Sequence, residues 1–377
     1  MTQPSPEQDL QTGLASAPAP TPGFAAPANP PRGPYYTWEV LIGAIVIGAL
    51  YGLAMRMVFD FAPFKGQGAQ NISGGMMVSF VFLVPMVIGV LTTLLARADR
   101  PLSYVFAFFG PWIPIAFFCF GASLLLLEGA ICIAIISPLL MLAGSVGGVI
   151  GALVRGANPQ LGRRTLPALL ALPLLTGYFE KDYVPEDHWS RVERAVEIHA
   201  PAAQVWQLIN HPTNISPTEM AGGLAYRIGV PYPIEANTLS EEVGGLRKLV
   251  WQKGVHFDEN ITAIDAQQRI CWTYHFAPDS FPHEALDDHV VIGGHYFDLG
   301  ETCYTLTPGA AGTRLAVSVE YRVSTNFNWY AGAWGKLLVG NTAETILNFY
   351  RVRGENGRGA SAAAAPTAPQ GQAIAGK

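Results

Sequence analysis

Four long apolar runs place the strongest constraint on the fold of this chain. Each is close in length to a helix that crosses the hydrocarbon core of a bilayer, which takes about 20 apolar residues. The charged residues of the first run, Glu39 and Arg56, lie near its two ends. We therefore predict a membrane α-helical bundle, whose first four spans are Thr37–Met57, Met76–Leu95, Tyr104–Leu127 and Ile131–Val154.

The middle of these four runs carries no charged residue. Ion pathways and proton relays need ionisable groups at membrane depth, so a transporter or pump is not expected. Pro111 and Pro114 predict a kink in the third span. Glu128-Gly129 predicts a tight hairpin between the third and fourth spans. The bundle is therefore predicted to act as an anchor.

A fifth apolar run, Leu166–Tyr178, has only 13 residues and contains two prolines. Arg163 and Arg164 could extend toward the headgroups at one end, and Tyr178-Phe179 could anchor the other end. The prediction is that this run crosses and gives five spans. The alternative is a helix that lies in the interface, which gives four spans.

The two ends of the chain have compositions typical of disorder. Residues 1–34 are rich in proline and alanine, and residues 356–377 are rich in alanine, glycine and proline. Such segments bury too little apolar surface to offset the entropy of ordering. The predicted division is a disordered tail at each end, a transmembrane region over 35–183 and a water-soluble domain over 184–355.

The water-soluble domain begins with a stretch whose apolar period changes partway along. From Val192 to Ile198 the pattern is close to the alternation of a strand with one buried face. Pro201 ends that strand and stands where the first turn of a helix tolerates proline. Residues 202–210 then follow helical spacing. A strand that leads into a short helix is therefore predicted.

Further strand patterns follow, and the domain ends with an amphipathic helix at Trp329–Tyr350. Two of the strands, Leu246–Trp251 and Val255–Ala263, are predicted to form a hairpin that turns at Lys253-Gly254. This order predicts an α+β helix-grip domain, a curved antiparallel sheet around a long C-terminal helix. The other predicted strands are Leu224–Leu239 (one or two strands), Arg269–Phe276, Glu301–Thr307 and Arg314–Val323.

Three motifs carry a resemblance to a known family. They are VEIHAPAAQVWQLI, GVHFDENITAIDAQQRICW and TPGAAGTRLAVSVEY, which lie between Arg191 and Arg353. This segment resembles the START/polyketide-cyclase (SRPBCC) superfamily, and the whole chain is similar to bacterial proteins that join such a domain to transmembrane helices. The resemblance implies a deep apolar cavity between the sheet and the last helix. It does not settle the chemistry, because one fold serves many functions.

Glu259 is the most informative candidate for a functional residue. On its strand it shares a face with Phe257 and Ile261. If that face points inward, the pKa of the carboxyl should rise, and Glu259→Gln should alter ligand binding while leaving the fold intact. The alternative is a register shift that leaves Glu259 on the rim. Aromatic residues predicted to line the cavity or its core are Trp251, Phe257, Trp272, Tyr274, Tyr304 and Trp334.

The segment Ala277–Phe297 is long for a connection within a compact domain, and such segments are usually lids or binding loops. Its candidate lid residues are His283, Asp287, His289 and His295. Their irregular spacing matches no metal motif, so no metal is expected. The chain also has no serine nucleophile elbow, P-loop or dinucleotide fingerprint, so no cofactor is expected.

The charge of the water-soluble domain bears on its binding partners, and its cysteines bear on a possible disulfide. Between Glu186 and Glu355 the chain has 12 lysines and arginines against 20 aspartates and glutamates, a net charge of −8, which disfavours nucleic acid as a partner. Cys271 and Cys303 could pair if their strands are neighbours in an oxidising compartment.

Three functions fit these patterns. The preferred one is binding of a hydrophobic small molecule or lipid by a pocket tethered to the membrane. The alternatives are a cyclase or dehydrase that uses Glu259 as acid and base with a lid histidine, and a regulatory module that binds a protein partner. An enzyme would need a second catalytic group in the cavity, and a regulatory module would have a filled cavity.

The distribution of basic residues predicts the orientation. Positively charged loop residues favour the cytoplasm. With five spans and a cytoplasmic amino terminus, the soluble domain faces the periplasm or cell exterior from the inner membrane; with four spans it is cytoplasmic. The cytoplasmic segments would then hold Arg32, Arg97, Arg100, Arg155, Arg163 and Arg164, against Arg56, Lys65 and Lys181 on the other side.

Overall fold

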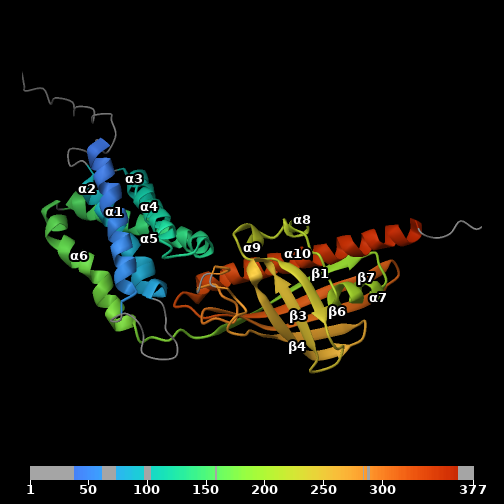
Figure 1. Cartoon of the computed structure of the whole chain (residues 1–377). Coiled ribbons are helices and arrows are strands. Elements are labelled where there is room, and N and C mark those ends of the chain that lie inside the picture. Colours follow the sequence, from blue (N-terminus) through green and yellow to red (C-terminus); the bar gives the residue numbers. More distant parts are fainter. Residues whose placement is uncertain are drawn as a thin grey trace, which may run out of the picture.

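The computed structural model describes residues 38–61, 74–96, 103–157, 159–282, 284–286 and 289–363. The chain forms two parts, a helical region at residues 38–180 and an α+β domain at residues 188–363, which lie side by side (Figure 1). The tail predicted at residues 1–34 and the last residues of the tail predicted at 356–377 lie outside the described residues.

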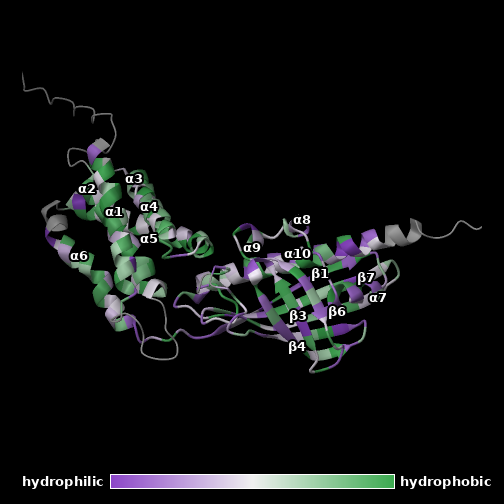
Figure 2. Ribbon diagram, in the orientation of Figure 1, coloured by the Kyte–Doolittle hydropathy of each residue, from purple (hydrophilic) through white to green (hydrophobic). Residues whose placement is uncertain are grey.

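Hydrophobic residues make up most of the helices of the helical region (Figure 2). Among the described residues, three segments are long and apolar enough to cross a membrane: Ile42–Phe59, Tyr104–Leu124 and Ala130–Ala157. The second predicted span corresponds to a shorter apolar helix, Ser79–Leu95. The elements are α1 (Trp38–Phe59), η2 (Gly74–Met76), η3 (Ser79–Leu83), α2 (Val84–Leu95), α3 (Tyr104–Phe109), α4 (Trp112–Leu124), α5 (Ala130–Ala157) and α6 (Pro159–Glu180).

In the part of the chain that the structure describes, the chain runs the length of the helical region five times, as α1, as η3 with α2, as α3 with α4, as α5 and as α6. At one end Arg155 of α5 donates to the carbonyl of Thr93 at the end of α2 (3.0 Å). At the other end the Ser79 amide donates to Glu180, the last residue of α6 (2.8 Å). The apolar part of α6 is short, but the helix returns the chain to the end where the α+β domain begins. The start of α1 and the α+β domain therefore lie at opposite ends of the bundle (Figure 1).

The helices of this region pack closely. The third predicted span is divided at Gly110-Pro111 into α3 and α4, so the kink predicted at Pro111 is confirmed. A Cβ atom at Gly89 of α2 would lie 2.1 Å from the carbonyl oxygen of Gly144 in α5. Only glycine allows these two backbones to approach so closely.

The α+β domain has a seven-stranded antiparallel sheet of order β1-β7-β6-β5-β4-β3-β2, curled around α10. The predicted helix-grip fold is confirmed. The strands are β1 (His188–Ile198), β2 (Pro233–Thr238), β3 (Leu246–Trp251), β4 (His256–Asp265), β5 (Arg269–His275), β6 (Phe297–Gly309) and β7 (Gly312–Val323). The helices are α7 (Ala202–Asn210), α8 (Pro217–Met220), α9 (Leu224–Arg227), η4 (Gln252–Gly254) and α10 (Asn328–Ala363).

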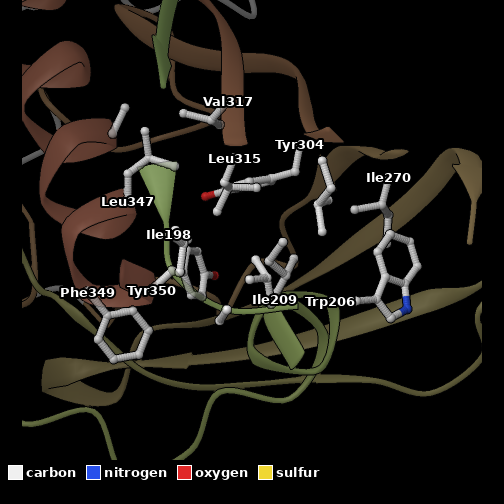
Figure 3. Close-up of a cluster of buried hydrophobic side chains, with 14 of the residues drawn as sticks. Ile198, Trp206, Ile209, Ile270, Tyr304, Leu315, Val317, Leu347, Phe349 and Tyr350 are labelled. Atoms are coloured by element: carbon white, nitrogen blue, oxygen red, sulfur yellow. The ribbon is translucent and has the colours of Figure 1, made fainter. Parts of the chain in front are cut away.

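The change of period in the opening stretch marks the boundary between β1 and α7. β1 pairs along its whole length with β7. Trp206 and Ile209 of α7 are buried against the sheet and the far half of α10. Side chains from the sheet, including Leu315 and Val317, meet Leu347 of α10 in this core (Figure 3). This core closes the end of the domain that lies away from the helical region.

Two predicted boundaries are wrong. The first part of Leu224–Leu239 is the short helix α9, and only the part from Pro233 pairs as a strand. The last helix extends past Gly354 to Ala363, into the segment predicted as a tail. A Cβ atom at Gly354 would lie 3.0 Å from Ile198. This glycine therefore allows α10 to pack closely on the end of β1 and does not stop the helix.

Cys271 and Cys303 form a disulfide. The two residues stand directly opposite each other on the neighbouring strands β5 and β6, which meets the first of the two conditions predicted for their pairing. Cys119 and Cys132 are buried in the helical region.

Candidate functional site

A cavity of about 290 Å³ lies between the sheet and α10. Its volume is near the lower end of the range for small-molecule sites, roughly 300–1,000 Å³. The lining is mainly apolar, with residues such as Val317 and Val319 from β7 and Leu338 and Ile346 from α10. α10 contributes residues from Tyr330 to Tyr350, about 30 Å of helix at 1.5 Å per residue, so the cavity is elongated.

Most of the residues predicted for the site line this cavity. They are Glu259, Trp251, Trp272, Tyr274, Tyr304, Trp334 and the lid residue His289. Phe257 is not part of the lining and is buried behind it, in an aromatic cluster with Phe276 and Phe281 that also contacts the lining residues Trp251 and Tyr274.

The predicted lid residue His295 is not part of the cavity lining. The ring of His295 packs edge-on against Tyr296, with the ring centroids 4.9 Å apart, and its carbonyl accepts from Arg322. His283 and Asp287 lie outside the described residues.

Glu259 is buried, with 2% of its surface exposed, so the inward-facing alternative is the correct one. Its carboxylate accepts a charged hydrogen bond from Arg247 of the neighbouring strand. Arg247 also donates to the carbonyl of Ile209 at the end of α7 (2.8 Å), and its guanidinium lies 4.7 Å from the centre of the Trp272 ring. A buried ion pair therefore stands in the wall of an otherwise apolar cavity.

The surroundings of Glu259 shift its protonation. Burial raises the pKa of the Glu259 carboxyl to about 7, against the opposing effect of the Arg247 guanidinium. Burial also raises the pKa of the Tyr274 hydroxyl, which shares a hydrogen bond with Thr302 (2.8 Å). Burial thus opposes the charged form of both groups, and the Arg247 guanidinium offsets part of this effect at Glu259.

Arg247 was not among the candidate residues, although the sequence contained a signal for it. A hairpin that turns at Lys253-Gly254 places the residues before and after the turn opposite each other. In the observed register, Arg247 stands directly opposite Glu259. If the predicted strands are paired residue by residue, starting with Trp251 opposite Val255, Arg247 falls opposite Glu259.

Several polar atoms in the cavity wall have no hydrogen-bond partner among the described residues. They are Nε of Arg247, Nε1 of Trp251 and the hydroxyl of Tyr226. Buried donors without partners are costly, and a ligand with acceptor oxygens would satisfy them.

The other end of the cavity reaches the helical region. Ile131, Cys132, Ile135 and Ile136 of α5 and Met76 of η2 form part of its wall. The two parts of the molecule also touch here. The Tyr330 hydroxyl of α10 donates to the carbonyl of Ile135 (2.5 Å), and Phe327 belongs to the core of the helical region.

A charged cluster, the junction cluster, lies beside this end of the cavity. It consists of Arg56, Asp60, Glu128 and His289. Glu128, in the hairpin between α4 and α5, accepts from Nε of Arg56 at 2.5 Å and lies 3.2 Å from Nδ1 of His289. Burial favours a raised pKa for the Glu128 carboxyl, but the contacts with His289 and Arg56 hold it below its usual value. Glu128 thus links a membrane helix, the hairpin and the lid segment.

Glu128, Cys132 and His289 offer a carboxylate, a thiol and an imidazole within 4.8 Å of one another. These donor types suit a divalent transition metal. The Arg56 guanidinium, however, already contacts the carboxylate, and its charge opposes a cation in the same place. The contacts of these residues are therefore those of an ion-pair cluster.

No protein-family model matches the chain. No curated protein matches it either. Among solved structures, the chain is similar to a START superfamily protein from Mycobacterium smegmatis, with 16% identity over 44% of this chain and 97% of that chain, at a TM-score of 0.28.

The chain is also similar to an aromatase/cyclase from Streptomyces sp. R1128, with 15% identity over 45% of this chain and 95% of that one, at a TM-score of 0.27. A protein from Nitrosomonas europaea shares 13% identity over 45% of this chain and 96% of that one, at a TM-score of 0.27. At these identities the similarity concerns the fold alone.

Proposed function

We propose that this protein is anchored in a membrane by its helical region and binds a hydrophobic small molecule or lipid in the cavity of its α+β domain. The observation that carries the proposal is the apolar cavity of about 290 Å³, with the Arg247–Glu259 pair and unpartnered donors in its wall. Ligand sites commonly combine an apolar lining with a few such polar groups. Glu259, Trp251, Trp272, Tyr274, Tyr304 and Trp334 are the proposed contacts.

The cavity argues against a regulatory module, and the position of His289 argues against an enzyme. A purely regulatory module would fill the space beneath α10 with its own side chains. A cyclase or dehydrase would need a second proton-transfer group beside Glu259. The lid residue His289 lines the cavity, but its described contact leads to Glu128 at the junction cluster. The arrangement therefore favours binding over catalysis.

A variant that fills the cavity tests this function. Leu338 of α10 lines the cavity, whereas its neighbour Leu337 is exposed and provides the control. The full chain is purified in mild detergent, and bound small molecules are identified by native mass spectrometry. We expect a bound apolar molecule in the parent and in Leu337→Trp, and its loss in Leu338→Trp. An empty parent protein, or equal occupancy of all three, would contradict the proposal.

We further propose that the α+β domain lies outside the cytoplasm, at the outer face of a bacterial inner membrane. Five passes of the chain support this, because they put the α+β domain and the start of α1 on opposite sides. Arg56, which counts against this orientation, is neutralised by Glu128 and Asp60. The disulfide between Cys271 and Cys303 also suits an oxidising compartment.

Reporter fusions after Asp182 test the orientation. We expect alkaline phosphatase to be active at this position and green fluorescent protein to be dark. A fluorescent, phosphatase-negative fusion would place the cavity in the cytoplasm.

A further inference from the structure

We propose that the ligand is a bilayer amphiphile that enters the cavity directly from the membrane, through a mouth formed by the first turns of α5 and the start of α10. This inference rests on the proposed binding function and specifies the source and class of the ligand. The mouth is defined by Ile131, Ile135 and Ile136 of α5, Met76 of η2 and Tyr330 of α10, all of which line the cavity.

The first observation is that a membrane helix forms part of the cavity wall. Ile131 and Ile135 are four residues apart on α5, so they lie on one face of the helix. That face meets the α+β domain, where a Cβ atom at Gly229 would lie 3.5 Å from Ile131. The cavity is therefore bounded by the α+β domain and by a helix that is apolar enough to cross the bilayer.

The length of α5 places this wall at the membrane boundary. The helix has 28 residues, which span about 42 Å at 1.5 Å per residue. A bilayer hydrocarbon core is about 30 Å thick. The first turns of α5 therefore extend toward the headgroups, where they can form a wall shared by lipid and cavity.

The surface around the mouth is suited to lipid contact. Leu124, Leu125 and Leu126, in the hairpin that leads into α5, are exposed, Leu126 to 91%. Three exposed leucines in sequence would be unfavourable in water and are favourable in lipid. Trp329 and Phe179 are also exposed at this end of the helical region. Aromatic side chains of this kind gather at membrane–water interfaces.

The polar groups of the cavity indicate which part of the ligand lies deepest. Arg247 stands near Tyr350, about 30 Å along α10 from Tyr330 at the mouth. Nε of Arg247 and the hydroxyl of Tyr226 have no hydrogen-bond partner among the described residues. An amphiphile whose polar end carries acceptor oxygens would satisfy these groups, while its hydrocarbon part lies against Ile131 and Ile135. A single-chain lipid with a small oxygen-rich end fits this description.

A bilayer-dissolved photoactivatable probe tests the proposal. The full chain is placed in phospholipid nanodiscs that contain a fatty acid with a diazirine in its chain, and labelled residues are mapped by mass spectrometry after illumination. We expect labelling of cavity residues such as Leu338 and Ile346. Substitution Ile135→Trp should block the mouth and abolish most of this labelling. Leu142→Trp, on the lipid-exposed side of α5 and 52% exposed in the parent, should leave it unchanged.

The outcomes separate this inference from the proposed function. In each variant, labelling of the outer surface of α5 at Val146 shows that the helical region has kept its fold. A parallel arm supplies the same fatty acid from water to protein in detergent. Labelling of the cavity in that arm, without labelling from nanodiscs, would overturn direct transfer from the bilayer while leaving ligand binding intact. Equal cavity labelling in the parent and Ile135→Trp would overturn the proposed mouth. Labelling in neither arm would overturn both proposals.

Discussion

A buried arginine–glutamate pair stands in the wall at one end of the cavity, a second one lies beside the other end, and the two pairs are built differently. Arg247 and Glu259 are neighbours on one hairpin, and their side chains are 4% and 3% exposed. Arg56 and Glu128 come from separate segments of the helical region, and their side chains are 5% and 11% exposed. The second pair also contacts Asp60 and His289, so it draws in the lid segment.

The difference concerns what each pair holds in place. The Arg247–Glu259 pair lies within one sheet and fixes groups that a ligand would meet. The Arg56–Glu128 pair joins a membrane helix, a hairpin and the lid segment, and so it fixes the position of the α+β domain on the helical region. Loss of the first pair should reduce the stability of the sheet, whereas loss of the second should loosen the mouth of the cavity.

The largest effect is expected from Glu259→Leu, which leaves the charge of Arg247 buried without a carboxylate. Removing one partner of a buried pair costs about 3–5 kcal/mol. The measurement is hydrogen exchange of the β3 and β4 amides in the full chain, which reports the local free energy of opening. The double variant Arg247→Leu/Glu259→Leu should recover most of this loss, because it removes both charges. A double variant as unstable as the single one would show that packing, and not charge, dominates at this site.

Replacement of Cys271 and Cys303 by alanine tests a second link between neighbouring strands. The disulfide closes a loop with a sequence separation of 32 residues, and its removal should cost about 2–4 kcal/mol through the greater entropy of the unfolded chain. The same exchange experiment on β5 and β6 measures the loss. Alanine in place of Cys119, which is buried in the helical region, provides the control and should leave these strands unchanged. No loss in β5 and β6 would mean that the bridge does not contribute to the stability of the sheet.

Glu128→Gln tests the junction cluster. The amide keeps the shape but loses the charge that Arg56 and His289 face, and the expected cost is about 1–3 kcal/mol. The effect should appear as faster exchange and proteolysis in Ala277–Phe297, with the centre of the sheet unaffected. Glu344→Gln removes an exposed partner of Arg194 and should change neither. If exchange becomes faster in both the sheet and the lid segment, the two ends of the cavity are coupled. The two ion pairs would then not have the separate roles described above.

The sequence predicted contacts within one hairpin better than contacts between segments that are far apart in the chain. The alternation of Phe257, Glu259 and Ile261 predicted that they share one face of β4, and the structure turns that face inward. The predicted ends of β3 and β4 also contained the register that pairs Arg247 with Glu259. Phe257 was predicted to line the cavity or its core, and it belongs to the core, because period alone does not separate residues that face a cavity from residues packed behind its lining. The face of β4, the register of the hairpin and the position of Phe257 all depend on residues close together in the chain, and the errors in predicting them are small.

The junction had no comparable signal in the sequence. A stripe of isoleucines in a membrane span looks the same whether it faces lipid or a cavity, so the role of Ile131 and Ile135 could not be read from the sequence. Glu128 was recognised only as part of a hairpin, because its partners Arg56 and His289 lie far away in the chain. Packing between the two parts of the molecule created this end of the site.

The smallest expected effect comes from a third arginine–glutamate pair, which is more exposed than the other two. Arg353 of α10 donates to Glu219 of α8 at 2.7 Å, and both side chains are about one quarter exposed, at 24% and 25%. The hydrogen bond from Arg353 is the main reason that the pKa of Glu219 falls to about 2, despite the opposing effect of partial burial. At neutral pH, Glu219→Gln should therefore destabilise the contact between α8 and α10 by about 0.5–1 kcal/mol.

The pH dependence of this effect has a definite sign. Because folding lowers the pKa of Glu219, its contribution is fully present above the unfolded value of about 4.5. The contribution is lost as the pH falls toward the folded value of about 2. The difference in stability between the parent and Glu219→Gln, measured by exchange at α8, should shrink across this range. Glu197→Gln, which removes a pair with Arg314 that is exposed on both sides, should show almost no difference at any pH. A difference for Glu219→Gln that stays constant with pH would mean that the carboxylate acts through the shape of the Ser216–Glu219 cap and not through its charge.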